Sequence, residues 1–466
     1  MKSNRNQEKS QFSVRVHILS FSNNKLINNQ QIKKKSLNQQ ITKNNQKRQK
    51  NKQLNNMSSN QQLPSSNLQE SVYEYCVVGA GPAGICAIAK ILERKVDPKK
   101  ILWVDPQFQV GAFGREWAGV PGNTSVESYI KVNQEIFKIL NKLTNESIPK
   151  FDIDTMPLKA TCALEVAAEP MQYITDRFLK IVSSQRSIVK KISRTNLGWA
   201  LLLDNGDNAF SNRIILSVGV KSRTVDLPKK ESQHIKIVPV EDIVDDQRLK
   251  KVSKGMKRVA VIGSSHTAAL ATMHLLQAGL TVCQFINAPY KYAQPITLNN
   301  QQSTLFDNTG LKGQVAEFTK KLTTDLVEEK YKKTIRFFKS DEQNLKKILP
   351  KCSHLVFAIG FEPNNKIEIE DYFDQNLTHD PLTSILRDGI FGIGISYPLQ
   401  QLNCGILEYQ VGYGKFWNTI NDYIINIWAS YPIVSAMQFQ QLAQRPMKQI
   451  SQTQIAQNTK TPIPRL

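Results

Sequence analysis

Three glycines spaced for dinucleotide binding stand near the start of the apolar part of the chain. The segment Gly79-Ala-Gly81-Pro82-Ala83-Gly84 fits the pattern G-x-G-x-x-G. In that pattern the first glycine makes a tight turn, the second lets the backbone approach a pyrophosphate, and the third lets a helix pack closely on a strand. The free N–H groups at the start of the helix then face the phosphates. We therefore predict that this loop binds a dinucleotide.

The predicted elements around the loop supply the context that the pattern requires. The segment "YEYCVVGAG" is a buried strand, "PAGICAIAKILERK" has apolar residues at helical spacing, and "KKILWVDP" is a second strand. Together they form a βαβ unit of about 35 residues. Asp105 ends the second strand about twenty residues after the glycines, where a carboxylate bonds a ribose hydroxyl. Strand, helix, strand and acid in this order make the motif specific.

A second, altered copy of the loop follows the strand "KRVAVIG" and opens another helix. It reads Gly263-Ser264-Ser265-His266-Thr-Ala268, with serine and alanine in place of the second and third glycines. Serine adds only a small side chain, and its hydroxyl can itself bond a phosphate. We therefore predict a second dinucleotide here. His266 either contacts a phosphate or fills the loop, and the sequence leaves both open.

The residues after this second βαβ unit bear on the choice of nucleotide. Asn287 stands at the end of the second strand, where many such units carry an acid. No carboxylate there repels a 2′-phosphate, and Lys291 is the cation close by in sequence. The sequence therefore favours NADPH over NADH, though only weakly.

Composition indicates a globular protein with an unusual leader. The chain has 466 residues, of which 40% are hydrophobic, and no apolar run reaches the roughly 20 residues that span a bilayer. About half of the net charge of +22 lies in the first 70 residues, which are dominated by Asn, Gln, Lys and Ser. Such a segment buries too little apolar surface to offset the entropy of ordering, so we expect it to be disordered.

Three interpretations of this leader remain open. Nucleic acid is a disfavoured partner because no aromatic residues are interleaved with the basic clusters. A mitochondrial presequence would be basic and poor in acids, as this segment is, but "FSVRVHILSF" alternates like a strand. We favour a start of translation at Met57. A mitochondrial location is thus the alternative to the expected cytoplasmic one.

The cysteines argue for an intracellular protein with reduced thiols. No two of them form a CxxC or CxxxxC pair, and no secretory signal is evident. The six are Cys76, Cys86, Cys162, Cys283, Cys352 and Cys404.

The expected binding partner of the protein is a small-molecule substrate.

Taken together, the patterns predict an α/β fold with two Rossmann-like dinucleotide-binding domains, the second inserted into the first. The predicted ranges are a disordered leader (1–70), the first domain (71–250), the inserted domain (251–348), the rest of the first domain (349–435) and a disordered tail (436–466).

The tandem loops, together with "IILSVGVKSR" and "LVFAIGFEPN", resemble the flavoproteins with two dinucleotide-binding domains. These include pyridine nucleotide–disulfide reductases, flavin-containing monooxygenases and N-hydroxylating monooxygenases. The resemblance covers residues 72–430. It implies that the first loop and Asp105 bind the ADP half of FAD, and that Gly263 and Ala268 bind NAD(P)H.

The resemblance also implies roles for residues outside the two loops. Gly219 and Gly360 end the connecting strands, which usually read A-T-G, and Gly394 belongs to a late FAD motif. Related monooxygenases place the loop "FGREWAGVPGNTSV" over the flavin ring. Within it, Asn123 is a candidate donor to the flavin or to an oxygen adduct, and Trp117 is a candidate wall that excludes water. Ordinary loop structure is the alternative for both.

Three departures shape the expected function. The Cys pair of the disulfide reductases is missing, as are the F-x-G-x-x-x-H-x-x-x-(Y/W) fingerprint of flavin monooxygenases and the acid after Gly394. We therefore expect an FAD-dependent NAD(P)H oxidoreductase that is monooxygenase-like. The alternatives are a reductase of a quinone or other small acceptor, and a nucleotide-binding scaffold without turnover.

Overall fold

The computed structural model describes residues 72–431, except for 196–197, 228–233, 299–300, 308, 325–326, 365–366, 371–378 and 404–405. The leader and tail that are predicted to be disordered lie outside these described residues. Among the residues that are described, no helix is long and apolar enough to cross a membrane.

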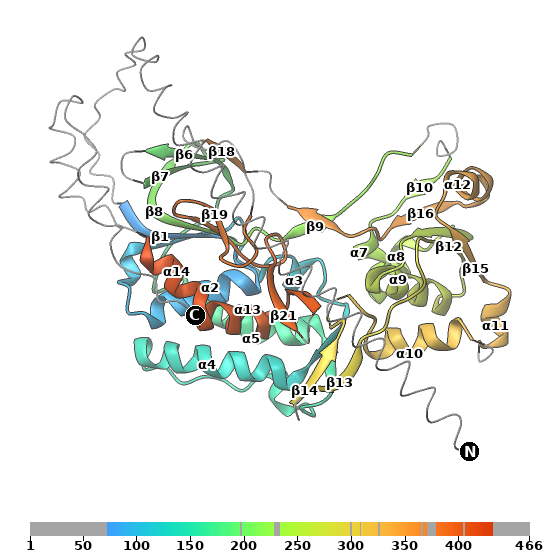
Figure 1. The fold of residues 1–466 in the computed structure, drawn as a ribbon, viewed down its shortest axis with the longest axis horizontal. Coiled ribbons are helices and arrows are strands. Elements are labelled where there is room, and N and C mark those ends of the chain that lie inside the picture. Colours follow the sequence, from blue (N-terminus) through green and yellow to red (C-terminus); the bar gives the residue numbers. More distant parts are fainter. Residues whose placement is uncertain are drawn as a thin grey trace, which may run out of the picture. The chain divides into compact units, whose positions relative to one another are not determined.

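The first sheet carries the first glycine loop at the end of its central strand. Its strands run in the order β18-β6-β7-β8-β1-β2-β5, and β20 also pairs with β8 (Figure 1). The bounds are β1 (Val72–Val78), β2 (Ile101–Val104), β5 (Ser183–Gln185), β6 (Val189–Thr195), β7 (Gly198–Leu203), β8 (Asn208–Leu216), β18 (Glu368–Glu370), β19 (Ile385–Arg387) and β20 (Ile390–Gly392). β1 is parallel to both β2 and β8. Its last four residues, Tyr75–Val78, are buried and mostly apolar, as is typical of a central parallel strand.

Helices cover one face of this sheet and enclose the larger core. They are α2 (Pro82–Glu93), α3 (Gly111–Arg115), α4 (Val126–Thr144), α5 (Leu164–Phe178), α13 (Tyr413–Thr419) and α14 (Ile425–Ser430), with the short 3₁₀ helices η1 (Pro98–Lys100) and η2 (Asp152–Thr155) and the π-helical segment η4 (Ile420–Ile424). α2 contacts α4, α5 and α13, and Figure 1 shows the four together on one side of the sheet. α2 connects β1 to β2, as the sequence predicts.

A second, fully parallel sheet carries the second glycine loop. Its order is β10-β16-β11-β12-β15, and α9 connects β11 to β12. The strands are β10 (Lys236–Ile237), β11 (Arg258–Ile262), β12 (Thr281–Ile286), β15 (Ile335–Lys339) and β16 (His354–Phe357). The helices are α7 (Val240–Ile243), α8 (Asp246–Val252), α9 (His266–Gln277), α10 (Gly313–Leu322), α11 (Glu329–Lys332) and α12 (Glu342–Ile348), with the turn η3 (Leu349–Lys351). The predicted α/β class with two Rossmann-like domains is confirmed.

This second sheet extends beyond the range predicted for the inserted domain. β10 precedes residue 251 and β16 follows residue 348, yet both pair within the second sheet. A helix-to-strand pattern alone does not reveal that these two short strands join it. We propose that the inserted domain spans about 236–357, and that the rest of the ordered chain belongs to the first domain.

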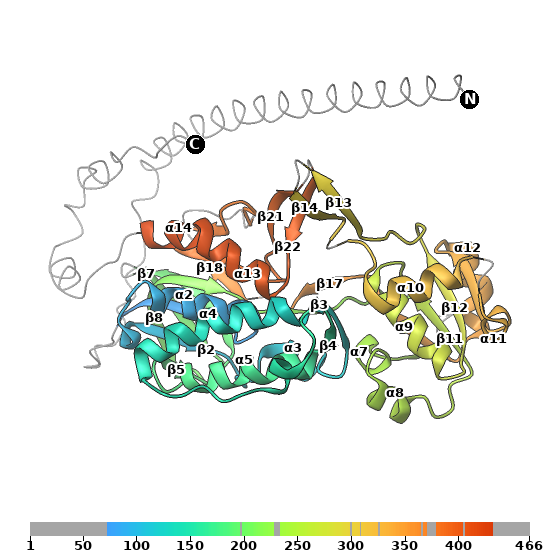
Figure 2. The ribbon, with the colours of Figure 1, turned by 90° about the horizontal axis from the view of Figure 1, so that it is seen from below.

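Two crossing segments and two hairpins complete the fold. β9 (Val220–Ser222) and β17 (Phe361–Pro363) are the two connections between the domains, and they pair antiparallel. The hairpins are β13 (Gln294–Leu298) with β14 (Gln301–Leu305), and β21 (Leu399–Asn403) with β22 (Ile406–Gln410). β3 (Pro121–Ser125) pairs with β4 (Thr161–Ala163). Figure 2 shows the β13–β14 hairpin beside β22.

Candidate nucleotide-binding sites

Two of the glycines in the first loop are required by close packing within the protein. A Cβ on Gly79 would lie 2.4 Å from the carbonyl oxygen of Ser217, at the end of β8. A Cβ on Gly84 would lie 2.0 Å from the carbonyl oxygen of Gly79. The Ser217 hydroxyl donates to the carbonyls of Val78 and Gly79 over 2.9 and 3.1 Å. The turn is therefore held against the next strand without any ligand.

Gly81 has no such packing partner. Whether the space beside it is open decides whether a pyrophosphate fits there. A Cβ there would meet nothing nearer than the carbonyl oxygen of Val110 at 3.9 Å, and the backbone is extended at φ −80° and ψ −179°. Nothing within the protein therefore requires glycine at this position. Gly81 is the N-cap of α2 without a side-chain cap, and Pro82 opens the helix without needing a hydrogen-bond acceptor. The space above this helix start suits the oxygens of a phosphate.

The Asp105 carboxylate accepts hydrogen bonds from backbone N–H groups, one of them in the first loop. Its Oδ2 accepts the N–H of Ala80 over 2.8 Å, and its Oδ1 accepts those of Gln107 and Phe108 over 2.8 and 2.6 Å. The carboxylate is buried, at 7% exposure. A ribose contact stays a prediction, and the structure adds a second role, because Asp105 fixes the glycine turn relative to β2.

The late glycine reaches the same place from the far end of the chain. A Cβ on Gly394 would lie 3.0 Å from the Cβ of Ala83, in the first turn of α2. The N–H of Ile393 donates to the carbonyl of Leu216, which extends the pairing of β20 with β8. The structure thus brings Gly394 and the first loop together, as the resemblance implies.

The second loop repeats the close packing of the first, except that its middle position is exposed. A Cβ on Gly263 would lie 2.2 Å from the carbonyl oxygen of Ala358, at the end of β16. Ala268 is fully buried in place of the third glycine. Ser264 lies in the turn, and Ser265 is exposed as the N-cap of α9 without a side-chain cap. The serine that replaces the middle glycine is therefore accommodated without close packing, and its contact with a ligand stays a prediction.

His266 begins α9 and is largely buried beside Lys312. Its Nδ1 has no hydrogen-bond partner among the described residues. Burial, reinforced by the Lys312 ammonium, lowers the pKa of His266 to about 4. The imidazole is therefore neutral at physiological pH and can offer only uncharged hydrogen bonds to a ligand.

Gly219 and Gly360 begin the two crossing connections. Their φ angles are +69° and +95°, and a Cβ on either would have no neighbour within 4 Å. The left-handed backbone accounts for glycine at both positions. Close passage beside a cofactor stays a prediction for this pair.

Trp117 lies where the two domains meet. Its ring meets Phe361 of β17 edge to face, with centroids 5.8 Å apart, and it packs against the core of the second sheet. Nearby, a Cβ on Gly119 would lie 2.2 Å from Asp245 Oδ2. Interface packing thus explains part of this loop, and a role of Trp117 beside the flavin stays a prediction.

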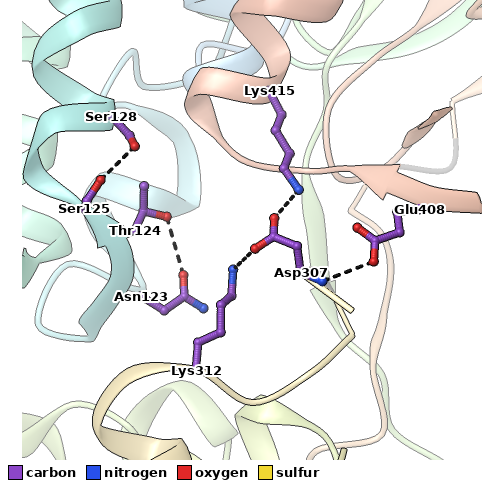
Figure 3. A network of polar contacts seen from close by, with 8 residues as sticks. All are labelled: Asn123, Thr124, Ser125, Ser128, Asp307, Lys312, Glu408 and Lys415. Carbon is purple, nitrogen blue, oxygen red and sulfur yellow. Dashed lines mark hydrogen bonds and ion pairs between the residues drawn. The ribbon is translucent and has the colours of Figure 1, made fainter. Parts of the chain in front are cut away.

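Asn123 lies on β3, apart from that packing. Its Oδ1 accepts a weak hydrogen bond from the Thr124 hydroxyl over 3.5 Å. Figure 3 draws this contact, and the same view contains the ion pairs of Asp307 with Lys312 and Lys415. Sequence reasoning assigned no role to these charged residues, because the contact of Asp307 with Lys415 joins segments about 100 residues apart.

The five cysteines that the structure describes are buried, and Cys404 lies outside the described residues. Burial raises the pKa values of the Cys76 and Cys86 thiols well above the ordinary value. Cys283 and Cys352 share a hydrogen bond in the core of the second domain, which lowers the pKa of the Cys283 thiol. This contact lies in the second sheet, whereas a redox-active pair would have to meet the flavin.

The fold and the two loops define an oxidoreductase of the type with two dinucleotide-binding domains. The model of the pyridine nucleotide-disulphide oxidoreductase family matches residues 73–393, and the chain belongs to this family. The protein is accordingly a flavoprotein whose cofactors are FAD and NAD(P)H.

The chain is also similar to individual proteins. "Monooxygenase AgnR1" of Paecilomyces divaricatus is 27% identical over 396 residues, which cover 74% of this chain and 95% of the relative. The bacillithiol disulfide reductase Bdr of Bacillus cereus is 12% identical at a TM-score of 0.49, covering 77% of this chain and 99% of that one. An FAD-bound cadaverine monooxygenase of Erwinia amylovora is 12% identical at a TM-score of 0.48, covering 78% and 97%.

Proposed function

We propose that this protein takes hydride from NAD(P)H through FAD and acts as a monooxygenase on a small organic substrate. The observation that carries the proposal is that one chain holds two glycine loops of the same construction, each at the carboxyl end of a parallel strand. The monooxygenase reading is supported by the relative of that name, which matches over 95% of its length.

The first loop is the proposed FAD site. Gly81 leaves room for the pyrophosphate, the N–H groups at the start of α2 face it, and Asp105 keeps the turn in place. When bound, FAD supplies the two-electron redox chemistry, while the protein supplies binding, orientation and shielding from water. Gly394 passes close to Ala83, so its backbone is the proposed second contact to the cofactor.

The second loop is the proposed NAD(P)H site. The start of α9 offers the N–H groups and hydroxyls of Ser264 and Ser265 to the pyrophosphate. His266 is neutral beside them, so it adds a hydrogen bond and no charge. Asn287 follows β12 where a ribose is expected, and NADPH is the proposed donor.

Two rival functions are distinguished by where the electrons go. A reductase would pass them to a quinone or another small acceptor, and a scaffold would bind nucleotides without turnover. The altered second loop and the isoleucine after Gly394 favour the scaffold. The retained packing of both loops favours an enzyme, because Gly263 and Ala358 approach as closely as Gly79 and Ser217 do.

Anaerobic reduction of the purified protein tests the proposal. We expect NADPH to bleach the flavin absorbance, faster than NADH by a small factor. Replacing Gly263 with valine should abolish bleaching and leave flavin content unchanged, because its side chain would collide with the Ala358 carbonyl. Gly279→Asn is the matched control, since Gly279 has a positive φ of +78° and open space around it.

Re-admitting air then separates the enzymatic readings. A transient absorbance to the blue of the oxidised flavin supports the monooxygenase, and immediate return of the oxidised spectrum supports a reductase. If neither nucleotide bleaches the flavin at millimolar concentration, the scaffold reading replaces both.

A further inference from the structure

One carboxylate joins the two domains through two lysines. Asp307, which follows β14 in the inserted domain, accepts a hydrogen bond at Oδ1 from Lys312 over 2.8 Å. Its Oδ2 pairs with the ammonium of Lys415, on α13 of the first domain. The backbone N–H of Asp307 donates to Glu408 of β22 over 3.1 Å. Figure 3 shows Asp307 between the two lysines, with Glu408 to its right.

Each end of this contact leads to one of the nucleotide loops. Lys312 is the N-cap of α10, which packs on α9, and it lies close enough to His266 to lower the pKa of that imidazole. Lys415 lies on α13, which packs on α2. The Tyr413 hydroxyl of α13 also donates to Asn133 of α4 over 3.0 Å. Asp307 thus links the helix of the second loop to the helix of the first.

The electrostatics of the contact make Asp307 its central member. Its side chain and those of both lysines are only 23–29% exposed. Burial opposes ionisation of Asp307, but the hydrogen bonds and charges of Lys312 and Lys415 outweigh it, so its pKa lies below the usual value. Without this carboxylate, two ammonium groups would face each other across the domain boundary, and they would repel.

We propose that Asp307 is a positioning residue for reduction of the flavin, holding the NAD(P)H domain in register with the FAD domain. The inference rests on the proposed function. Hydride transfer needs the nicotinamide within about 3–3.5 Å of the flavin, and a misplacement of about 1 Å can cost on the order of 100-fold in rate. A contact that sets the distance between the two loops therefore acts on the rate without touching either nucleotide.

The test is stopped-flow reduction of the full-length, flavin-loaded protein by NADPH without oxygen. We expect Asp307→Asn to lower the limiting rate by about 10- to 100-fold. Its flavin content and the NADPH concentration at half-maximal rate should stay within about threefold, because both loops remain intact. Asp307→Glu keeps the charge and should recover most of the rate. Glu317→Gln, which breaks an exposed pair with Lys320 on α10, is the matched control and should react like the wild type.

Salt supplies a readout that simple loss of structure would not give. Partly exposed ion pairs weaken as the Debye length falls from about 10 Å at 0.1 M to about 3 Å at 1 M salt. The wild-type limiting rate should therefore fall with salt. That of Asp307→Asn should stay constant or rise, because salt also screens the repulsion between Lys312 and Lys415, so the two rates should converge. If Asp307→Asn does not purify with flavin, Lys415→Gln tests the same contact from the first domain.

The possible results separate the two hypotheses. A limiting rate unchanged in Asp307→Asn and Lys415→Gln overturns the positioning role while leaving the proposed function intact. A change confined to the half-maximal NADPH concentration also overturns it, because that result assigns Asp307 to nucleotide binding. A wild type that NADPH does not reduce is instead a failure of the proposed function.

Discussion

The N–H of Ala80 donates to Oδ2 of Asp105 over 2.8 Å. In the first βαβ unit, the residue that follows the second strand therefore holds the glycine turn that follows the first strand. The bond is buried and spans 25 positions of the chain. A buried N–H that loses its acceptor costs about 1–3 kcal/mol. The carboxylate therefore contributes to the stability of the turn before any nucleotide binds.

Asp105→Asn should weaken both the turn and FAD binding. Both oxygens of the carboxylate accept backbone N–H groups, three in all. In an asparagine one of these oxygens becomes an NH₂ group, which is a donor and would face at least one N–H. We expect a loss of about 1–3 kcal/mol in unfolding free energy and weaker FAD binding. Urea denaturation of the FAD-free protein and FAD titration measure the two effects. Asp97→Asn, in an exposed cap of η1, is the control. Wild-type stability in Asp105→Asn would contradict the structural role.

Gly81 and Gly84 should respond to the same substitution in opposite ways. An added methyl on Gly81 meets no protein atom nearer than 3.9 Å, whereas one on Gly84 collides with the Gly79 carbonyl oxygen at 2.0 Å. Gly81→Ala should keep the wild-type melting temperature of the FAD-free protein and lose FAD affinity by tenfold or more, on the order of 1.4 kcal/mol. Gly84→Ala should lower the unfolding free energy by about 1–3 kcal/mol.

The larger variant Gly81→Val sharpens this comparison. It should yield a colourless protein, because a branched side chain stands where the pyrophosphate must approach. Full flavin content in purified Gly81→Val would show that the first loop is not the FAD site.

His266 should make the folded state sensitive to acid. Burial lowers its pKa in the native state from 6.5 to about 4, so the unfolded chain binds the proton first as pH falls. Its favourable contribution is complete above pH 6.5 and is lost between about pH 6.5 and 4. The wild type should lose about 2 kcal/mol more than His266→Gln between pH 7.5 and 5. Urea denaturation of both proteins at the two pH values measures the difference, and parallel losses would refute the assignment.

Both βαβ units could be predicted from the sequence because their signals are local. In each unit the glycine spacing and the helical periodicity lie within one short segment, and in the first unit so does Asp105. The approach of Gly394 to Ala83 could only be implied through resemblance, since about 300 positions separate them. The same holds for Asp307 and Lys415, which are ordinary surface charges until the fold pairs them. The strand β16 was predicted from its apolar run, but its pairing with β11 in the second sheet was not, and the two-residue strand β10 carries too little periodicity to be predicted.

Lys339, rather than Lys291, should set the preference for NADPH. The Lys291 ammonium lies over the Phe306 ring, 3.5 Å from its centroid, and is thereby engaged. Lys339 ends β15 directly beside Ile286, the last residue of β12, and its side chain is exposed. Ligands of parallel sheets bind beyond the carboxyl ends of the strands, so we expect a 2′-phosphate next to Asn287 to be within reach of this ammonium.

Lys339→Ala should therefore raise the NADPH concentration at half-maximal flavin reduction by about tenfold and leave that of NADH unchanged, as expected for a lost charge-assisted hydrogen bond of about 1.5 kcal/mol. Lys291→Ala should have a smaller effect, and Lys346→Ala, whose ammonium pairs with Glu342 on α12, is the control. Anaerobic reduction of the wild type and the three variants at a series of NADPH and NADH concentrations gives these values. An equal effect of Lys339→Ala on both nucleotides would mean that the residue stabilises the domain and does not read the phosphate, and no effect on either would place the 2′-phosphate elsewhere.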